Sequence, residues 1–389
     1  MSPNKTHWPL IFLLWFAGLG ASMQFAKISV TFHELEKHYA ANASQISLVL
    51  SLTGLVGLLL AASSSLLIQR WGYKLVLLSA LLLGALLSFI EAALPTLSTL
   101  LILRIIEGAS HLAIVVTAPT LMAAASAPQH RSLVMSLWGT FFGVSFSIAS
   151  AFAPTLTNVY GVAGLYITHG VWMLLIFAAL LILLDKHLIA STPTNISLRS
   201  IIERHKHIYG HFNTVLPSLV FICYTSMYVA LLTLLPLMGP TPEWVMVALP
   251  LISIAGAFCS GLINQYWLSP PAMVKLAFVW VLFALVALGF AHMHGWNLDL
   301  FKIALFLGLG LQQGAIYGMI PYLAKESHQQ AQSIAAIAQM GNLGSTIGPP
   351  LFASAWASFA VSGLIGLGIL ITGAGLLLML YAFWNLQKH

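Results

Sequence analysis

Residues 73–94 read YKLVLLSALLLGALLSFIEAAL, a run in which only Lys74 and Glu91 are charged. A transmembrane α-helix needs about 20 consecutive, mostly apolar residues, because the hydrocarbon core of a bilayer is about 30 Å thick. This run is long enough to cross that core, whereas a strand in a soluble protein has only about 5 or 6 residues. The stretch therefore predicts a membrane-spanning helix.

Runs of this kind recur along the whole chain of 389 residues. Charged residues make up 6% and hydrophobic residues 59%, with a mean hydropathy of +0.94, so a water-soluble globule is excluded. We predict an all-α membrane protein with twelve transmembrane helices. The predicted spans lie near 8–32, 45–69, 73–94, 97–124, 131–157, 161–184, 213–238, 243–266, 272–291, 298–324, 329–357 and 361–385.

One connection is much longer and more polar than the others. Residues 185–212 divide the chain into two six-span halves, 1–184 and 213–389. Apolar positions repeat there at helical spacing, which favours a cytoplasmic linker with a short helix in the membrane interface over an ordinary solvated loop. These positions are Leu198, Ile201, Ile202, His205 and Ile208.

The distribution of Lys and Arg predicts the orientation, because these residues are enriched in cytoplasmic loops. With the N-terminus inside, all of the 15 Lys and Arg residues except Lys27, Lys37, Arg104 and Lys302 fall in cytoplasmic segments. We expect both termini in the cytoplasm and a place in a bacterial inner (cytoplasmic) membrane. The net charge of +6 comes without a basic cluster, so nucleic acid is not an expected partner.

The two halves are related to each other. Pro119 matches Pro321, and Gly139 matches Gly341, at the same separation in sequence. This agreement predicts two six-helix pseudo-repeats. A parallel repeat of this kind places the substrate site between the halves, near the middle of the bilayer.

The loop between the second and third spans resembles the signature loop of the major facilitator superfamily. Arg70, Gly72 and Lys74 match the pattern, whereas Ser65 and Gln69 replace the usual Gly and Asp. Glycine permits a tight turn there, and the basic residues hold the loop on the cytoplasmic side. The resemblance implies a twelve-helix secondary transporter that works by alternating access, with Arg70, Gly72 and Lys74 in its conformational loop.

A second stretch, Arg104-Ile-Ile-Glu107-Gly108, is similar to the superfamily's motif in the fourth span. Another motif, which ends in Gly-Pro and marks many of its antiporters, is lost here because Val144-Ser145 stands in its place. That replacement weakens the resemblance to drug-efflux carriers.

Ionisable groups inside spans are costly and are therefore candidates for function. Arg104, Glu107 and His111 share one helical face, and protonation of Glu107 would release Arg104. We predict that these three residues carry proton coupling, although a static ion pair and a core histidine are the plainer alternatives. His169 has the same two alternatives, and Glu91 is expected at the membrane interface.

In the superfamily, the first, fourth, seventh and tenth spans line the substrate cavity. Together with Trp138 on the fifth span and two residues of the eleventh, they supply the candidate substrate-binding residues. These are Gln24, Lys27, Arg104, Trp138, Tyr224, Tyr228, Gln312, Gln313, Tyr317, Gln339 and Asn342. Lys27 has an equal alternative, in which its side chain extends outward to water. Single amides and tyrosines in spans also often join helices.

With Glu107 set aside, Lys27 and Arg104 leave this candidate cavity positive. We therefore predict a proton-coupled transporter, active as a monomer, for a small anionic or zwitterionic solute such as a metabolite or a carboxylate-type metal chelate (a siderophore, for example). The alternatives are a drug-efflux antiporter and a transporter-like sensor that does not transport. We expect no enzyme, because no span combines a nucleophile with a base, and neither a cofactor nor a metal ligand set is predicted.

Overall fold

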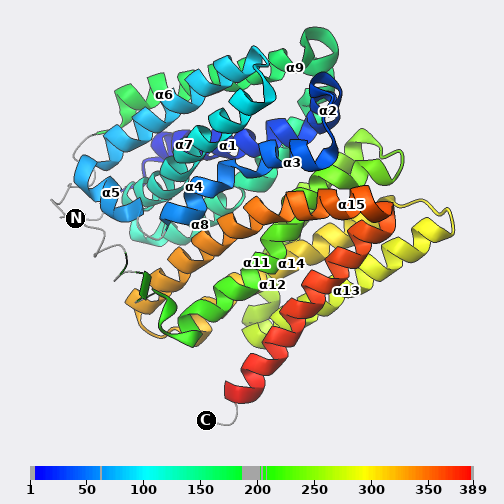
Figure 1. Cartoon of the computed structure of the whole chain (residues 1–389). Coiled ribbons are helices and arrows are strands. Elements are labelled where there is room, and N and C mark those ends of the chain that lie inside the picture. Colours follow the sequence, from blue (N-terminus) through cyan, green and yellow to red (C-terminus); the bar gives the residue numbers. More distant parts are fainter. Residues whose placement is uncertain (1–4, 62–63, 186–201, 203–204, 207, 387–389) are drawn as a thin grey trace. The chain divides into compact units, whose positions relative to one another are not determined.

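The computed structural model describes residues 5–61, 64–185, 202, 205–206 and 208–386, and all regular structure in these residues is helical (Figure 1). The chain forms two compact units, one of Met1–Ala41 with Leu52–Ile202 and the other of Asn42–Ser51 with Glu203–His389. Of the five positions that define the predicted interfacial helix of the linker, Leu198 and Ile201 lie outside the described residues, and Ile202, His205 and Ile208 are helical.

The helices of the first unit carry the candidate site. They are α1 (Trp8–Val30), α2 (Phe32–Tyr39), α4 (Thr53–Leu60), α5 (Ser64–Trp71), α6 (Tyr73–Ala92), α7 (Leu97–Ala124), the short 3-10 helix η2 (Pro128–His130), α8 (Arg131–Gly139) and α9 (Phe141–Leu183). α1 packs against α7 and α9, α6 packs against the same two helices, and α4 packs against α7. Lys27, Arg104 and Glu91 of α1, α7 and α6 are thereby turned into the interior of the unit.

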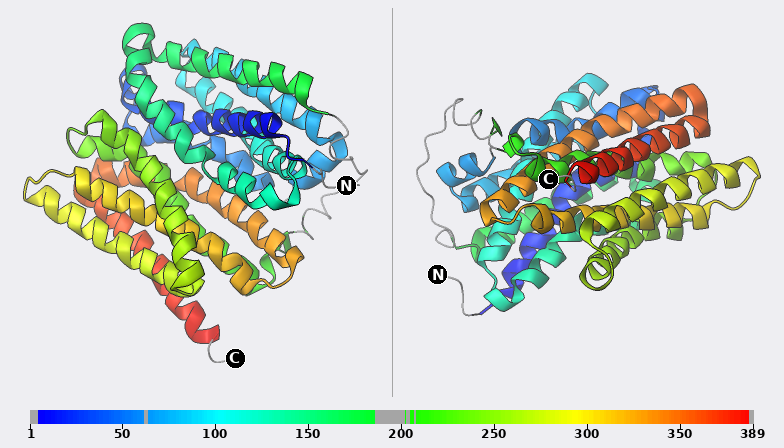
Figure 2. Two further views of the ribbon diagram at one scale, coloured as in Figure 1. Left: turned by 180° about the vertical axis from the view of Figure 1, so that it is seen from behind. Right: turned by 90° about the horizontal axis from the view of Figure 1, so that it is seen from below.

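The second unit contains α3 (Ala43–Ser51), α11 (Phe212–Leu234), the 3-10 helix η3 (Leu235–Met238), α12 (Glu243–Tyr266), α13 (Pro270–Met293), α14 (Asp299–Leu323) and α15 (Ser327–Leu386). α11 packs along α15, α12 packs along α14, and α3 packs on α15. Figure 2 shows these helices from two further sides.

Among the described residues, nine helices are long and apolar enough to cross a membrane, and α3 with α4, bent by 47°, counts as a tenth if the pair is one span. α9 and α15 have 43 and 60 residues, so straight helices would be about 65 and 90 Å long, well beyond one bilayer. Each is broken once, at Gly161 (φ 67°) and at Ala360 (φ 48°), and each therefore supplies two spans. The return of α15, from orange to red, is visible in Figure 1. The predicted fold class is confirmed.

Glycines allow the closest helix contacts, and they repeat between the units. A Cβ at Gly108 of α7 would lie 2.5 Å from the carbonyl oxygen of Thr53 on α4. A Cβ at Gly310 of α14 would likewise overlap the carbonyl oxygen of Ser253 on α12. Gly108 and Gly310 have the same separation in sequence as Pro119 and Pro321. The pseudo-repeat predicted from sequence is thus also a repeat of helix packing.

Candidate functional site

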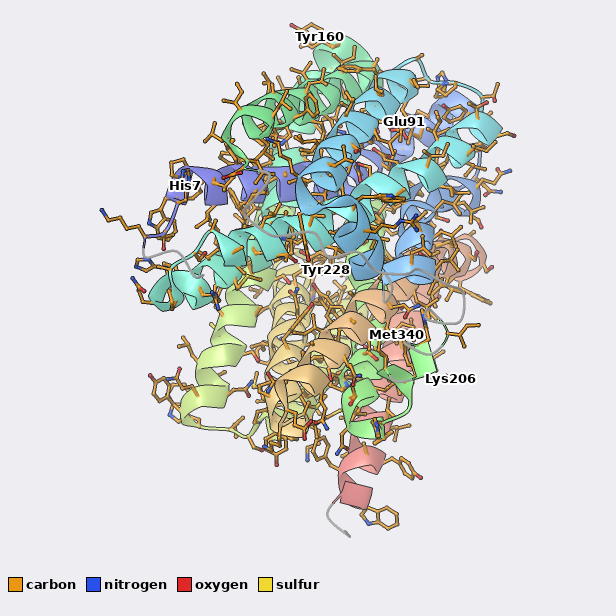
Figure 3. The ribbon with its side chains drawn as sticks, turned by 90° about the vertical axis from the view of Figure 1, so that its left-hand side faces the viewer. His7, Glu91, Tyr160, Lys206, Tyr228 and Met340 are labelled. Atoms are coloured by element: carbon orange, nitrogen blue, oxygen red, sulfur yellow. The ribbon has the colours of Figure 1, made fainter. Side chains whose placement is uncertain are left out.

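Four charged side chains meet inside the first unit, and none of them is exposed. Lys27 comes from α1, Glu91 from α6, and both Arg104 and Glu107 from α7. Glu91 is labelled in Figure 3, among the helices of this unit. We call these residues the four-charge cluster. With both carboxylates ionised, its net formal charge is zero.

Lys27 is surrounded by oxygen atoms. Its Nζ lies 2.6 Å from Glu91 Oε2, 2.8 Å from Glu107 Oε1 and 2.9 Å from Ser88 Oγ. A lysine ammonium has three N–H donors, so each donor has one oxygen within reach. The ring of Tyr166 covers a further side, with its centroid 5.2 Å from Nζ. These contacts hold Lys27 as a charged ammonium in the protein interior.

Arg104 binds the same two carboxylates through their other oxygens. Its guanidinium forms an ion pair with Glu107 Oε2, lies 3.5 Å from Glu91 Oε1 and donates to the carbonyl oxygen of Gln24 at 2.5 Å. Each carboxylate therefore bridges the two cations. Removing one partner of a buried ion pair costs about 3–5 kcal/mol, because the other charge stays desolvated. The contributions of the four residues to stability are therefore expected to be coupled.

A hydrogen-bonded chain leads away from Lys27. Ser88 Oγ lies 2.7 Å from His169 Nδ1, and His169 Nε2 lies 2.9 Å from the carbonyl oxygen of Gly20. A carbonyl oxygen only accepts, so Nε2 carries a proton, and in a neutral imidazole Nδ1 then accepts from Ser88. The Ser88 hydroxyl then donates to His169 and accepts from Lys27.

His111 does not join this chain through any described hydrogen bond. Its Nδ1 donates to the carbonyl oxygen of Ala21 at 3.0 Å, and its ring packs edge-on against Phe25, with centroids 5.0 Å apart. These are the contacts of a hydrogen-bonded core histidine. A role for His111 in proton transfer stays a prediction.

Two residues lie deeper in the protein than their positions in sequence suggested. Glu91, expected to face water at the interface, is fully buried, and Lys27 does not reach out to water. The sequence places Glu91 near the end of the predicted span 73–94, which favours an interfacial position. Charge balance is the signal in the sequence that indicates a buried Glu91. Two buried bases, Lys27 and Arg104, need a second acid besides Glu107 to compensate their charge.

Gln24 and Trp138 are placed among side chains of the first unit. Gln24 Nε2 donates to Ser110 Oγ at 3.0 Å, and Gln24 is fully buried. Trp138 stacks on Phe141, with centroids 4.4 Å apart, and lies against Gly18 of α1. Both residues therefore join helices in this structure, and their substrate role stays a prediction.

In the second unit, α11 and α14 bring several of the predicted residues together. The Tyr224 hydroxyl donates to Gln313 Oε1 at 3.2 Å. The rings of Tyr224 and Tyr228 are 5.4 Å apart, and Tyr317 of α14 meets Phe221 edge-on. We call Tyr224, Tyr228, Gln313 and Tyr317 the aromatic–amide group; Tyr228 is labelled in Figure 3.

Gln312 lies beside this group in sequence but has a different environment. It is fully buried, and within the described residues neither of its amide atoms has a hydrogen-bond partner. An unsatisfied buried amide is costly, so a water molecule or a polar group of a ligand would stabilise it.

Gln339 and Asn342 of α15 make other contacts. Gln339 accepts from the Tyr209 hydroxyl at 2.9 Å and contacts His205 Nε2 at 3.2 Å. Burial raises the pKa of Tyr209 to about 12, so this hydroxyl keeps its proton and donates. Asn342 donates to the carbonyl oxygen of Ala338 in its own helix. The structure does not bring these two residues into the aromatic–amide group.

Comparison with known families identifies the chain. A model of the Major Facilitator Superfamily matches residues 11–349, which include the four-charge cluster and most of both units. The chain belongs to the major facilitator superfamily. A comparison with curated proteins finds no significant match. Membership makes the chain a multi-pass membrane protein and a secondary transporter, in a family of transporters rather than enzymes.

The superfamily's signature loop has the expected turn. Gly72 adopts φ 85°, a conformation that disfavours residues with a side chain, and Arg70 is exposed. Lys74 Nζ donates to the carbonyl oxygens of Leu184 at 2.5 Å and Leu181 at 3.1 Å. Lys74 therefore satisfies carbonyl groups that the end of α9 leaves without helical partners.

Among the described residues, no group of three or more His, Cys, Asp or Glu side chains is placed to hold a metal ion. The groups described above are the four-charge cluster, Ser88 and His169 in one unit, and the aromatic–amide group and Gln312 in the other.

Proposed function

We propose that this superfamily member is a proton-coupled secondary transporter for a small anionic or zwitterionic organic solute. The observation that carries the proposal is the four-charge cluster, in which two carboxylates and two bases balance each other with no exposure to solvent. Buried ionisable groups in transporters are typical proton sites.

The cluster explains how a proton and an anion would bind together. Protonation of one carboxylate leaves an excess positive charge in a medium of low dielectric constant, which is unfavourable unless an anion compensates it. Glu91 therefore changes the basis of the substrate prediction. Lys27 and Arg104 do not give a standing positive charge; the charge arises when the cluster takes up a proton.

Glu107 is the proposed proton acceptor. It contacts Lys27 at 2.8 Å and pairs with Arg104, so its protonation loosens both cations at once. Arg104 would keep its contacts with Glu91 and with the Gln24 carbonyl oxygen. The N–H groups that paired with Glu107 would then be able to donate to an anion. His111, four residues further along α7, is a candidate for relaying the proton.

Substrate contacts beyond the cluster are proposed for the aromatic–amide group and Gln312. Their hydroxyl and amide groups both donate and accept hydrogen bonds, which suits the polar parts of a metabolite or chelate. Alternating access, an inner-membrane location, cytoplasmic termini and a monomeric state complete the proposal. The asymmetry of Lys and Arg supports the orientation.

Efflux of a lipophilic compound is the second candidate. The feature that favours it is the aromatic line of Phe221, Tyr224 and Tyr228 on α11, which continues to Phe306 on α14. Aromatic faces bind flat apolar compounds and organic cations.

Flux measurements on the purified protein in liposomes test the proposal. Labelled carboxylates, amino acids, iron–carboxylate chelates and lipophilic cations are offered with and without a pH gradient. We expect accumulation of an anion or zwitterion that depends on the gradient, and Glu107→Gln should lose accumulation but retain exchange of the same solute. Glu243→Gln, an exposed acid at the start of α12, is the matched control. Normal uphill transport by Glu107→Gln would contradict the proton site, and transport of lipophilic cations alone would favour efflux.

A further inference from the structure

The surroundings of Lys27 Nζ have the composition of a site for a monovalent cation. Three side-chain oxygens lie at 2.6, 2.8 and 2.9 Å, and two of them belong to carboxylates. Distances of about 2.7–2.9 Å are typical of an ammonium group that donates to carboxylates, and they exceed the 2.0–2.1 Å of Mg²⁺. The position therefore fits an ion of ammonium size.

The three oxygen atoms around Nζ belong to side chains that have further partners, Arg104 and His169. Arg104 pairs with Glu107 Oε2 and lies near Glu91 Oε1, which are the carboxylate oxygens that Lys27 does not contact. Ser88 donates to His169, so a lone pair of its oxygen is directed to Nζ. The lysine side chain takes no part in these contacts with Arg104 and His169.

We propose that Lys27 is a tethered cation, which fills the position that a free monovalent cation would otherwise occupy between Glu91, Glu107 and Ser88. Removal of its amine leaves a site for ammonium, methylammonium or K⁺. The consequence for transport rests on the proposed function. The Lys27 amine excludes Na⁺ from this position, so the transporter takes a proton as its coupling ion.

A purely structural ion pair makes a different prediction. Loss of Lys27 would then leave two desolvated carboxylates with Arg104 as their cation, and would destabilise the protein equally whatever cation is in the buffer. Dependence on cation identity at constant ionic strength therefore separates the two, because general screening depends on ionic strength alone.

The test compares thermal unfolding of Lys27→Ala in ammonium, methylammonium, K⁺, Na⁺ and N-methylglucamine chlorides at equal ionic strength. We expect ammonium and methylammonium to raise its Tm by at least about 3 °C over N-methylglucamine, in a saturable manner. The wild-type Tm should not distinguish Na⁺ from N-methylglucamine. The matched control is Lys302→Ala, since Lys302 is also fully buried but donates to the hydroxyl of Thr241.

Two further results keep the test decisive. The double variant Lys27→Ala/Glu107→Gln has the wild-type net charge and should lose the cation response, because one carboxylate of the site is gone. Saturable stabilisation of the wild type by Na⁺ overturns the inference. A Lys27→Ala protein whose Tm responds to cations no more than that of Lys302→Ala also overturns it. So does a Lys27→Ala protein that cannot be obtained in folded form in any of these cations. Cation rescue together with uphill transport by Glu107→Gln would retain the tethered cation and reject the proposed proton site, so the two failures are distinguishable.

Discussion

Ser88 and His169 are joined by a hydrogen bond of 2.7 Å that fixes the direction of the serine hydroxyl. When a neutral His169 donates from Nε2 to the Gly20 carbonyl oxygen, its Nδ1 accepts, and the Ser88 hydrogen points away from Lys27. A single main-chain oxygen of α1 thus sets the hydrogen-bond polarity of a chain that ends at Lys27.

Ser88→Ala should weaken the first unit. The change removes one of the three oxygens around Lys27 and leaves His169 Nδ1 without its donor, and an unsatisfied buried polar group costs about 1–3 kcal/mol. Thermal unfolding of the purified variant measures the loss. Ser79→Ala on the same helix is the control, since Ser79 is exposed and its hydroxyl donates to the Leu75 carbonyl oxygen of its own helix. Equal Tm values for the two variants would argue against the polarity described above.

Lys27 and Glu91 should be strongly coupled in stability. Each single variant, Lys27→Met or Glu91→Gln, leaves the buried four-charge cluster with one uncompensated charge, and we expect a loss of about 3–5 kcal/mol. The double variant removes both charges, so its loss should be smaller than the sum by at least about 1 kcal/mol. Unfolding of all four proteins in one detergent completes the cycle. Additive losses would mean that the 2.6 Å contact carries no net interaction energy.

Gly310→Ala should separate α12 from α14. The added Cβ overlaps the Ser253 carbonyl oxygen, and overpacking of a tight contact costs about 1–3 kcal/mol. Gly261→Ala on α12 is the matched control, because nothing lies within 4 Å of its Cβ position. A lower Tm is expected for Gly310→Ala alone. If both variants unfold at the same temperature, the two helices do not depend on this close approach.

Tyr224→Phe should affect binding more than stability. The hydroxyl donates to Gln313, and a hydrogen bond between membrane helices contributes only about 0.6 kcal/mol on average. A ligand that uses the same hydroxyl and amide loses a partner inside a closed site, and we expect its affinity to fall by about tenfold. The concentration dependence of the ligand-induced Tm shift measures this. An unchanged affinity would remove Tyr224 from the proposed substrate contacts.

Hydropathy alone predicts the number of spans, because each run must match the thickness of a bilayer. The same constraint predicts the reversals at Gly161 and Ala360, although no glycine or proline marks the second one. Periodicity likewise predicts that Arg104 and Glu107 share a face, since both lie on one helix.

Local sequence patterns do not predict the partners of that pair, because they come from two other helices, α1 and α6. Glu91 reaches the cluster through the packing of α6 against α7, which no local pattern encodes. Gln339 has its partners in residues 205 and 209, which precede α11 in sequence. Contacts of this kind depend on tertiary structure, and a single sequence does not specify them.

The hydrogen bonds of three polar side chains reach main-chain carbonyl oxygens of α1: His169 at Gly20, His111 at Ala21 and Arg104 at Gln24. A peptide oxygen is the same whichever side chain its residue carries. Substitutions at these α1 positions therefore require no compensating change at the partner residue. Correlated substitution between relatives reveals many contacts in proteins, but it should not reveal these three pairs. Mutation of the donor residues, His169, His111 and Arg104, would be needed to detect them.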